Sequence, residues 1–320
     1  MKFLTSLLFV LFATASLAAP LPVPKELQNQ AINVVIPYAA GGGADTWNRI
    51  IFKQVSINTG LNFLIVNRPG ATGAIGTSAV AVAKPDGLTI MASEGGPIVL
   101  SPLMKSPGFT ERDKFRTVAI TVLTPHGIFV PSNSKYNTIQ DLVADIKANP
   151  DKVNFGCSSG FCTPTMGRMM DGLGVDLQPI RYNDTIKMLT DVAGGNLTFA
   201  SADPTGIVQS RGGKIKPLAF SPDHRLKEFP NIPVYKEVVP GLAAEWFQGV
   251  WVPAATPDHI INYLNQVIRE VIPTPETQDA AHVRGARTMS MNASDSEAFV
   301  TRQIQIFKPW IEKYYHPEKQ

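Results

Sequence analysis

The chain has 320 residues, a formal net charge of +3, and 44% hydrophobic and 17% charged residues. This length allows a large core and favours two domains, and the composition is that of a globular α/β protein. The charge is small and no basic run occurs, which argues against a nucleic-acid-binding surface.

The N-terminus has the features of a secretory signal. Lys2 precedes an apolar run over residues 3–15, and Ser16 and Ala18 are small residues at the two positions that signal peptidase inspects. The run is shorter than the roughly 20 residues of a membrane-spanning helix. We therefore predict that residues 1–18 are removed and that the mature protein lies in the periplasm.

The first unit after this signal is a strand, a glycine turn and a helix. Residues 32–36 form an apolar run rich in Ile and Val, and three glycines at 41–43 precede an amphipathic segment over 45–55. Unpaired N–H groups and the helix dipole favour an anion at a helix N-terminus. The pattern predicts an anion site at this turn, although a merely flexible connection would also use glycines.

The next unit has the same order. A strand over 62–66 leads into a glycine turn at 67–73, a helix of small residues over 74–83, and a third strand over 88–92. This β-α-β-α-β order predicts a parallel sheet with helices on its faces. Ligands collect beyond the carboxyl ends of such strands, and both glycine turns are predicted to lie there.

A nearly continuous apolar stretch over residues 117–131 is long enough to carry the chain into a second lobe. We expect a second α/β set after it, with helices at 138–147, 166–173 and 185–193 and strands at 153–155, 177–181, 197–201 and 214–220. A strand at 246–253 is predicted to return the chain. Three helices are then predicted to cover the first lobe, at 257–271 after a Thr256-Pro257 cap signature, 275–283 and 294–315.

One catalytic motif requires attention. The segment GCSSG at residues 156–160 follows a predicted strand and matches G-x-S-x-G, with Ser158 in the place of a nucleophile. Asp203 and then His224 or His259 follow in the order found in α/β-hydrolases. A secreted serine hydrolase is therefore one candidate function.

The helix signal after this motif favours a different interpretation. A nucleophile elbow needs a helix directly after the serine, whereas Thr163 and Pro164 are a favoured N-cap and first helical residue. A serine-rich binding loop, whose hydroxyl and amide groups donate to a ligand, is the favoured reading.

Four other side chains have both a structural and a binding interpretation. Asp203 precedes Pro204 and either caps a helix or presents a carboxylate to a cleft. Asp45 either stabilises its own helix or takes part in the site. Tyr38 and Tyr182 follow strands and either wall a cleft or only pack.

The two cysteines, Cys157 and Cys162, are predicted to form a disulfide, because an exported chain enters an oxidising compartment. No metal or nucleotide cofactor is predicted. The five histidines are scattered without a metal-binding spacing, and neither a G-x-G-x-x-G nor a Walker pattern occurs; the histidines are His126, His224, His259, His282 and His316.

The chain contains, in order, the passages IPYAAGGGADTWNR, VNRPGATGAIGTSAVAVAKPDGLTIM, IRYNDTIKMLTDVAGGNLTFASADP, IKPLAFSPDHRLKEFPNIPV and WVPAATPDHIINYLNQVI. Together these passages resemble the Bug family, the extracytoplasmic receptors of tripartite tricarboxylate transporters. The resemblance spans nearly the whole mature chain. The segment CSSGFCTPTMGRMM departs from the family, in which a glycine- and serine-rich loop without cysteines is expected.

The resemblance implies an α/β, two-lobed periplasmic binding protein of type II topology, in which each lobe is a mixed sheet flanked by helices and a ligand cleft lies between the lobes. Lobe 1 would comprise residues 19–124 and 246–320, and lobe 2 residues 125–245. Such a receptor is not an enzyme and needs no cofactor. It is expected to act as a monomer that captures a small carboxylate for membrane transporter subunits.

The resemblance also implies which residues bind the ligand. In the family, backbone amides and waters at the first two turns hold the ligand carboxylate, and the second lobe closes over its other end. The predicted ligand-binding residues are Tyr38, Ala40, Gly41, Gly42, Gly43, Ala44, Asp45, Gly70, Ala71, Thr72, Gly73, Ser93, Ser158, Ser159, Gly160, Thr163, Tyr182 and Asp203.

Overall fold

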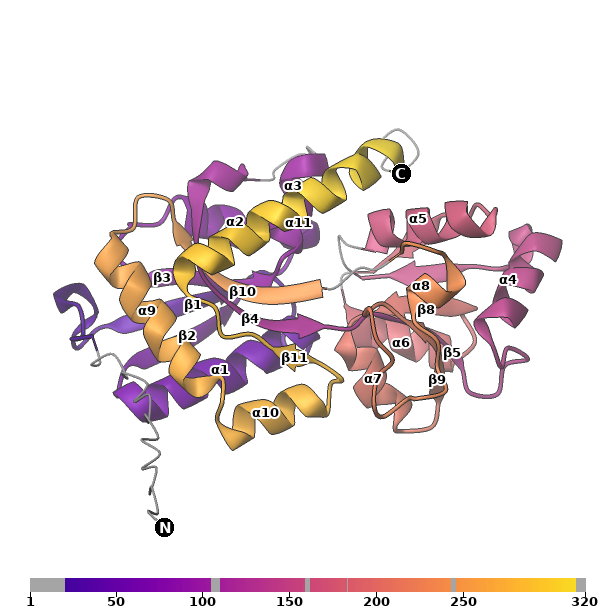
Figure 1. Ribbon diagram of the computed structural model, residues 1–320, viewed down its shortest axis with the longest axis horizontal. Coiled ribbons are helices and arrows are strands. Elements are labelled where there is room, and N and C mark those ends of the chain that lie inside the picture. Colours follow the sequence, from indigo (N-terminus) through magenta and orange to yellow (C-terminus); the bar gives the residue numbers. More distant parts are fainter. Residues whose placement is uncertain (1–20, 105–109, 159–161, 183, 243–245, 315–320) are drawn as a thin grey trace, which may run out of the picture.

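Two β-sheets, each flanked by helices, lie side by side in the computed structural model (Figure 1). The structure describes residues 21–104, 110–158, 162–182, 184–242 and 246–314. The predicted signal segment, residues 1–18, lies outside these ranges. Among the described residues, no helix is both long and apolar enough to cross a membrane.

The first sheet has six strands in the order β11-β4-β10-β3-β1-β2. Strand β1 pairs in parallel with β2 and β3, as the sequence predicts, whereas β10 is antiparallel to both β3 and β4. The sheet is therefore mixed. Its strands are β1 Ala31–Ile36, β2 Asn62–Asn67, β3 Thr89–Glu94, β4 Phe115–Thr124, β10 Trp246–Pro253 and β11 Arg287–Thr288.

Helices cover both faces of the first sheet. One face packs against α1 (Gly43–Thr59), α9 (Asp258–Val271) and α10 (Pro275–His282). The other face packs against α2 (Ala74–Ala81), α3 (Gly96–Met104) and α11 (Ala293–Tyr314). Helix α3 has no counterpart in the sequence prediction.

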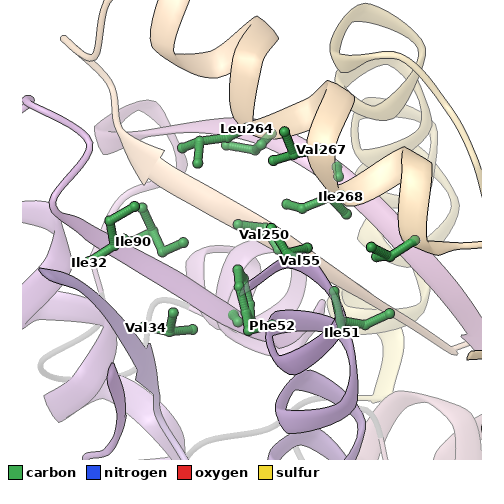
Figure 2. Close-up of a cluster of buried hydrophobic side chains, with 14 of the residues drawn as sticks. Ile32, Val34, Ile51, Phe52, Val55, Ile90, Val250, Leu264, Val267 and Ile268 are labelled. Atoms are coloured by element: carbon green, nitrogen blue, oxygen red, sulfur yellow. The ribbon is translucent and has the colours of Figure 1, made fainter. Parts of the chain in front are cut away.

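The core under α1 and α9 follows from the apolar period of the sequence. Helix α9 buries Ile260, Leu264, Val267, Ile268 and Val271, which recur at the three- and four-residue spacing of one helix face. In Figure 2 side chains of α1 and α9 face those of β1, β3 and β10. The predicted cap at Thr256 is one residue early, because Pro257 is the N-cap of α9.

The second sheet has five strands in the order β7-β6-β8-β5-β9. Strand β6 is parallel to β7 and β8, and β5 is antiparallel to β8 and β9. The predicted strand at 153–155 lies two residues early relative to β6. The strands are β5 Gly127–Pro131, β6 Phe155–Cys157, β7 Pro179–Arg181, β8 Phe199–Ala202 and β9 Ile215–Phe220.

The second sheet also has helices on both faces. Helices α4 (Ile139–Ala148), α5 (Cys162–Leu173) and α8 (Tyr235–Val238) share one apolar cluster. Helices α6 (Thr185–Ala193) and α7 (Pro204–Ser210) share the other. The short helix α8 lies in a stretch for which the sequence predicts no regular element.

The chain passes between the two sheets at two adjacent places. Strand β4 ends at Thr124 and β5 begins at Gly127 in the other sheet, with Pro125 between them. A proline cannot donate to a strand ladder, so the predicted continuous strand is divided there. On the return passage Trp246 pairs with Thr124, and its ring stacks on His126 with 3.7 Å between centroids.

Helix α11 extends from the first sheet toward α5 of the second (Figure 1). Arg168 of α5 lies over the ring of Trp310, with its guanidinium carbon 4.9 Å from the centroid. Lys313 forms an ion pair with Asp171 at 3.0 Å. The prediction that the C-terminal helices cover the first lobe is therefore incomplete, because α11 contacts both lobes.

Candidate functional site

A cavity lies between the two sheets, at the carboxyl ends of strands from both. The turn after β1 and the end of β3 form one wall, and residues that follow β6, β7 and β8 form the other. About 380 Å³ of empty space, including the open mouth, lies inside it. The lining residues are Tyr38, Ala39, Ala40, Gly42, Gly43, Ala44, Glu94, Ser158, Asp184, Thr185 and Asp203.

The first glycine turn opens helix α1 directly at this cavity. Gly42 is the N-cap residue in an extended conformation, and Gly43 is the first helical residue. Gly41 has φ +86°, a left-handed conformation that side chains disfavour. The N–H groups at the start of α1 therefore line the cavity with the positive end of a 17-residue helix behind them.

Asp45 holds this turn in place instead of lining the cavity. Its carboxylate accepts the Gly41 N–H at 2.9 Å, the Arg49 guanidinium at 2.9 Å and the Asn67 amide at 2.9 Å. Burial alone would raise its pKa, but these hydrogen bonds lower the pKa of Asp45. Asn67 also donates to the Tyr38 carbonyl at 3.0 Å, so the network ties β2 to the first turn.

Asp203 performs both of the roles that its sequence position allows. It is the N-cap of α7, and its Oδ1 accepts the Thr205 N–H at 2.7 Å. Its carboxylate also accepts a hydrogen bond from the Gly43 N–H of the other lobe. A Cβ atom at Gly43 would lie only 3.0 Å from Asp203 Oδ2. Burial raises the pKa of Asp203 despite these hydrogen bonds.

Glu94 and Tyr38 lie beside Asp203 on the first-lobe wall. The Tyr38 hydroxyl donates to the Glu94 carboxylate, and both side chains are half-buried. Burial, and then the negative charge of Asp203, raise the pKa of Glu94 to about 8. Burial and the charge of Glu94 raise the pKa of Tyr38. Two acidic side chains from different lobes thus share the cavity.

Two hydroxyl groups of the second lobe complete the wall. Ser158 Oγ lies 2.8 Å from Thr185 Oγ1, and Thr185 donates to the Asp203 carboxylate. Asp184 is the N-cap of α6 and accepts the N–H groups of Ile186 at 2.7 Å and Lys187 at 3.1 Å.

The surroundings of Ser158 differ from those of a hydrolase nucleophile. Its hydroxyl is paired with Thr185, while His224 lies 2.7 Å from Asp223 and His259 lies 3.2 Å from Glu26. The candidate triad is therefore not assembled in this structure. Helix α5 begins at Cys162, one residue before the predicted cap at Thr163, and so not directly after the serine.

Comparison with known proteins identifies the family. A family model described as the tripartite tricarboxylate transporter family receptor matches residues 48–315, which is most of the chain. The chain belongs to this receptor family.

Individual relatives agree with this assignment. A UPF0065 protein of Bordetella bronchiseptica is 30% identical to this chain, and the match covers 92% of this chain and 88% of the Bordetella protein. The solved structure of the periplasmic binding protein BugD is 27% identical with a TM-score of 0.82, covering 89% of this chain and 98% of BugD. An R. palustris protein solved with adipate is 23% identical with a TM-score of 0.84, covering 89% and 97%, and shares the fold.

The predicted binding residues of the receptor divide into three groups. Those that line the cavity are Tyr38, Ala40, Gly42, Gly43, Ala44, Ser158 and Asp203. Those that are described but do not line it are Gly41, Asp45, Gly70, Ala71, Gly73, Ser93 and Tyr182. Outside the described residues or side chains are Ser159, Gly160 and the side chains of Thr72 and Thr163.

The second glycine turn of the receptor packs behind the first. A Cβ at Gly73 would lie 3.3 Å from Pro97, 3.5 Å from Pro37 and 3.6 Å from the Tyr38 ring. Tyr182 packs in the second lobe instead, where its hydroxyl donates to Asp191 at 2.8 Å. Neither feature touches the cavity in this structure.

Sequence reasoning missed three polar lining residues of the receptor: Glu94, Asp184 and Thr185. The sequence contains a feature that could have identified each of them. Glu94 is an acidic residue at the carboxyl end of an apolar strand, where ligands collect. Asp184 and Thr185 stand at the start of a predicted helix that follows a strand, with Asp184 in the N-cap position.

The two cysteines of the receptor lie at the edge of this site. The structure bridges Cys157, the last residue of β6, to Cys162, the first residue of α5, with their Cα atoms 5.9 Å apart. Both are buried in the apolar cluster under α5.

Proposed function

We propose that this chain is a non-catalytic, periplasmic receptor that captures a small carboxylate between its lobes for a tripartite tricarboxylate-type transporter. The observation that carries the proposal is the start of α1, which opens at an interlobe cavity and whose Gly43 N–H already binds a carboxylate there, that of Asp203. Such a helix N-terminus binds a carboxylate without needing a basic side chain. Membership of the receptor family supports the transporter partner.

We further propose lobe 1 as residues 19–124 and 246–320, lobe 2 as 125–245, and a monomer as the working unit. The passage at Pro125–His126, beside the return of the chain at Trp246, would serve as the hinge that opens the cavity. Export is proposed from the signal-like start, and the intact mass of exported protein tests it. Retention of residues 1–18 would contradict export.

A thermal-shift screen of mono-, di- and tricarboxylates tests the receptor function. A ligand that binds only the folded state adds about 2.7 kcal/mol at a hundred times its dissociation constant. We expect at least one small carboxylate to raise the unfolding midpoint at millimolar concentration, and matched methyl esters to have no effect. If no carboxylate shifts the midpoint of the folded protein, the proposed function fails.

Ser158→Ala separates the receptor from the alternative secreted serine hydrolase. In the receptor the change removes one hydroxyl that is bonded to Thr185, so affinity for the carboxylate should fall by at most about tenfold. Native protein should remain unlabelled by a fluorophosphonate. Covalent labelling of Ser158, with ester turnover that the alanine variant loses, would favour the hydrolase.

A further inference from the structure

Two amide side chains stand at positions where the core under α1 and α9 is otherwise apolar. On β10, Gln248 shares its face of the sheet with Val250 and Val252, which both belong to that core. On α1, Asn48 lies one turn before Phe52 on the buried face of the helix. Asn48 is fully buried and Gln248 is 5% exposed. Neither is one of the residues that line the cavity, so contact with a ligand does not explain them.

Hydrogen bonds join these two amides to the first turn of α1. Asn48 Nδ2 donates to Gln248 Oε1 at 3.2 Å and to the Ala44 carbonyl at 2.8 Å. Gln248 Nε2 donates to the Gly43 carbonyl at 3.4 Å. The pair therefore fastens to β10 the same residue, Gly43, whose N–H donates to Asp203 of the other lobe.

Strand β4 is joined to this turn as well, through Thr121. The pairing of β4 with β10 shifts between Gln248 and Gly249, so that Thr121 falls between the partners of these two residues. Such a bulge redirects a side chain. Thr121 Oγ1 accepts the indole N–H of Trp47 at 3.0 Å and donates to the Gln248 carbonyl at 3.2 Å. The start of α1 is thus tied to both strands that lead into the passages between the sheets.

The amide pair has a cost in stability. Asn48 Oδ1 is buried and has no hydrogen-bond partner among the described residues. An unpaired buried acceptor destabilises a fold, whereas two apolar side chains of similar size would fill the same space without that penalty. Buried polar side chains are known to fix a register at the expense of stability. Stability therefore does not account for the pair.

We propose that Asn48 and Gln248 are positioning residues, which hold the start of α1 at a fixed distance from β10 so that the Gly43 N–H meets the Asp203 carboxylate when the lobes close. The inference rests on the proposed function, because closure over a ligand uses the same turn. In this role neither side chain contacts the ligand, and both act through the backbone of Gly43 and Ala44. Binding groups need to be held within about 0.5 Å of their working positions.

Replacement of both amides separates position from stability. In the double variant Asn48→Leu with Gln248→Met, apolar side chains of similar size replace the pair, so its midpoint of urea unfolding should equal or exceed that of the wild type. The turn loses its hydrogen bonds to β10. Affinity for whichever of acetate, succinate and citrate binds the wild type should therefore fall by about tenfold or more. Gln248→Met alone should lower both the midpoint and the affinity, because it leaves the Asn48 amide without this partner.

The Gly43 amide provides a readout that needs no ligand. In glycine-labelled wild-type protein its proton resonance should move as Asp203 titrates, because this N–H donates to that carboxylate. In the double variant the response should be lost, and the pKa of Asp203 should rise further because the carboxylate has lost a donor. Glu94 and Arg284, charged groups that interact with Asp203, are unchanged in every variant.

Asn265→Leu is the matched control. Asn265 is a buried amide on α9, where its Nδ2 donates to the Val118 carbonyl at 2.7 Å and to the Met291 carbonyl at 3.0 Å. Its loss leaves these carbonyls without a donor, so the urea midpoint should fall. The Gly43 response and the carboxylate affinity should stay at their wild-type values.

The outcomes separate this inference from the proposed function. If the folded double variant, or Gln248→Met alone, keeps either the Gly43 response or the wild-type affinity, the inference is overturned. It is also overturned if the wild-type Gly43 proton does not respond to Asp203, or if Asn265→Leu weakens binding as much. If no carboxylate binds the wild type while the Gly43 response is lost only without the amide pair, the proposed function fails and the positioning role stands.

Discussion

Gly43→Val is expected to weaken ligand binding by about a hundredfold while leaving the fold intact. Gly43 has the backbone angles of an ordinary first helical residue, so a side chain brings no backbone strain there. The added Cβ would lie 3.0 Å from Asp203 Oδ2 and 3.2 Å from its Cγ. Overpacking of this kind costs about 1–3 kcal/mol, and here it pushes Asp203 away and so opposes closure of the lobes over the proposed carboxylate position.

Titration with the carboxylate that binds most tightly measures the loss of affinity. Thermal unfolding tests whether the fold of the variant is intact. Gly43→Ala should give an intermediate loss of affinity. Gly194→Ala, a similar change at the C-cap of α6 where a Cβ meets nothing closer than 3.4 Å, should bind normally. A folded Gly43→Val protein with unchanged affinity would show that the start of α1 is not the carboxylate position.

Glu94→Gln is expected to stabilise the unliganded protein at pH 8 and to have little effect near pH 4. The pKa of Glu94 is about 8 in the folded state and near its usual 4.5 in the unfolded chain. Between these values the folded state binds the extra proton, so the free energy of unfolding falls as pH rises. This difference corresponds to at most about 5 kcal/mol, and solvent screening in the cavity reduces the expected gain to about 2 kcal/mol.

Urea unfolding of the wild type and the variant at pH 4, 6 and 8 measures this effect. The difference in unfolding free energy should grow with pH and level off above pH 8. The control Glu276→Gln, exposed on α10, should track the wild type. A constant difference between the variant and the wild type from pH 4 to pH 8 would contradict the raised pKa of Glu94.

Much of the architecture can be predicted from the sequence, because it depends on patterns among residues that are close together along the chain. The apolar run of β1, the glycines at 41–43 and the period of α1 place a helix start beyond a strand end. The stretch at 117–131 indicates the passage between the sheets, and the structure adds only the division at Pro125.

The sequence did not predict which side chain at the end of β3 lines the cavity. Successive side chains of a strand point to opposite faces, so an uncertainty of one residue changes which side chain meets the cavity. The sequence prediction names Ser93, which is fully buried with its hydroxyl unpaired, while the adjacent Glu94 lines the cavity. The second glycine turn was also predicted to bind the ligand; Gly73 packs behind Tyr38 in this structure, and a binding role for the turn stays a prediction.

The sequence by itself determined the two α/β units, the helix start at the first glycine turn and the membership of a receptor family. Each of these depends on short-range patterns or on similarity along the chain. Only the tertiary structure decided that Asp203 of one lobe meets Gly43 and Glu94 of the other. These contacts depend on how the two sheets are placed relative to each other by the passages at Pro125 and Trp246, and no local sequence pattern specifies the distance between the lobes.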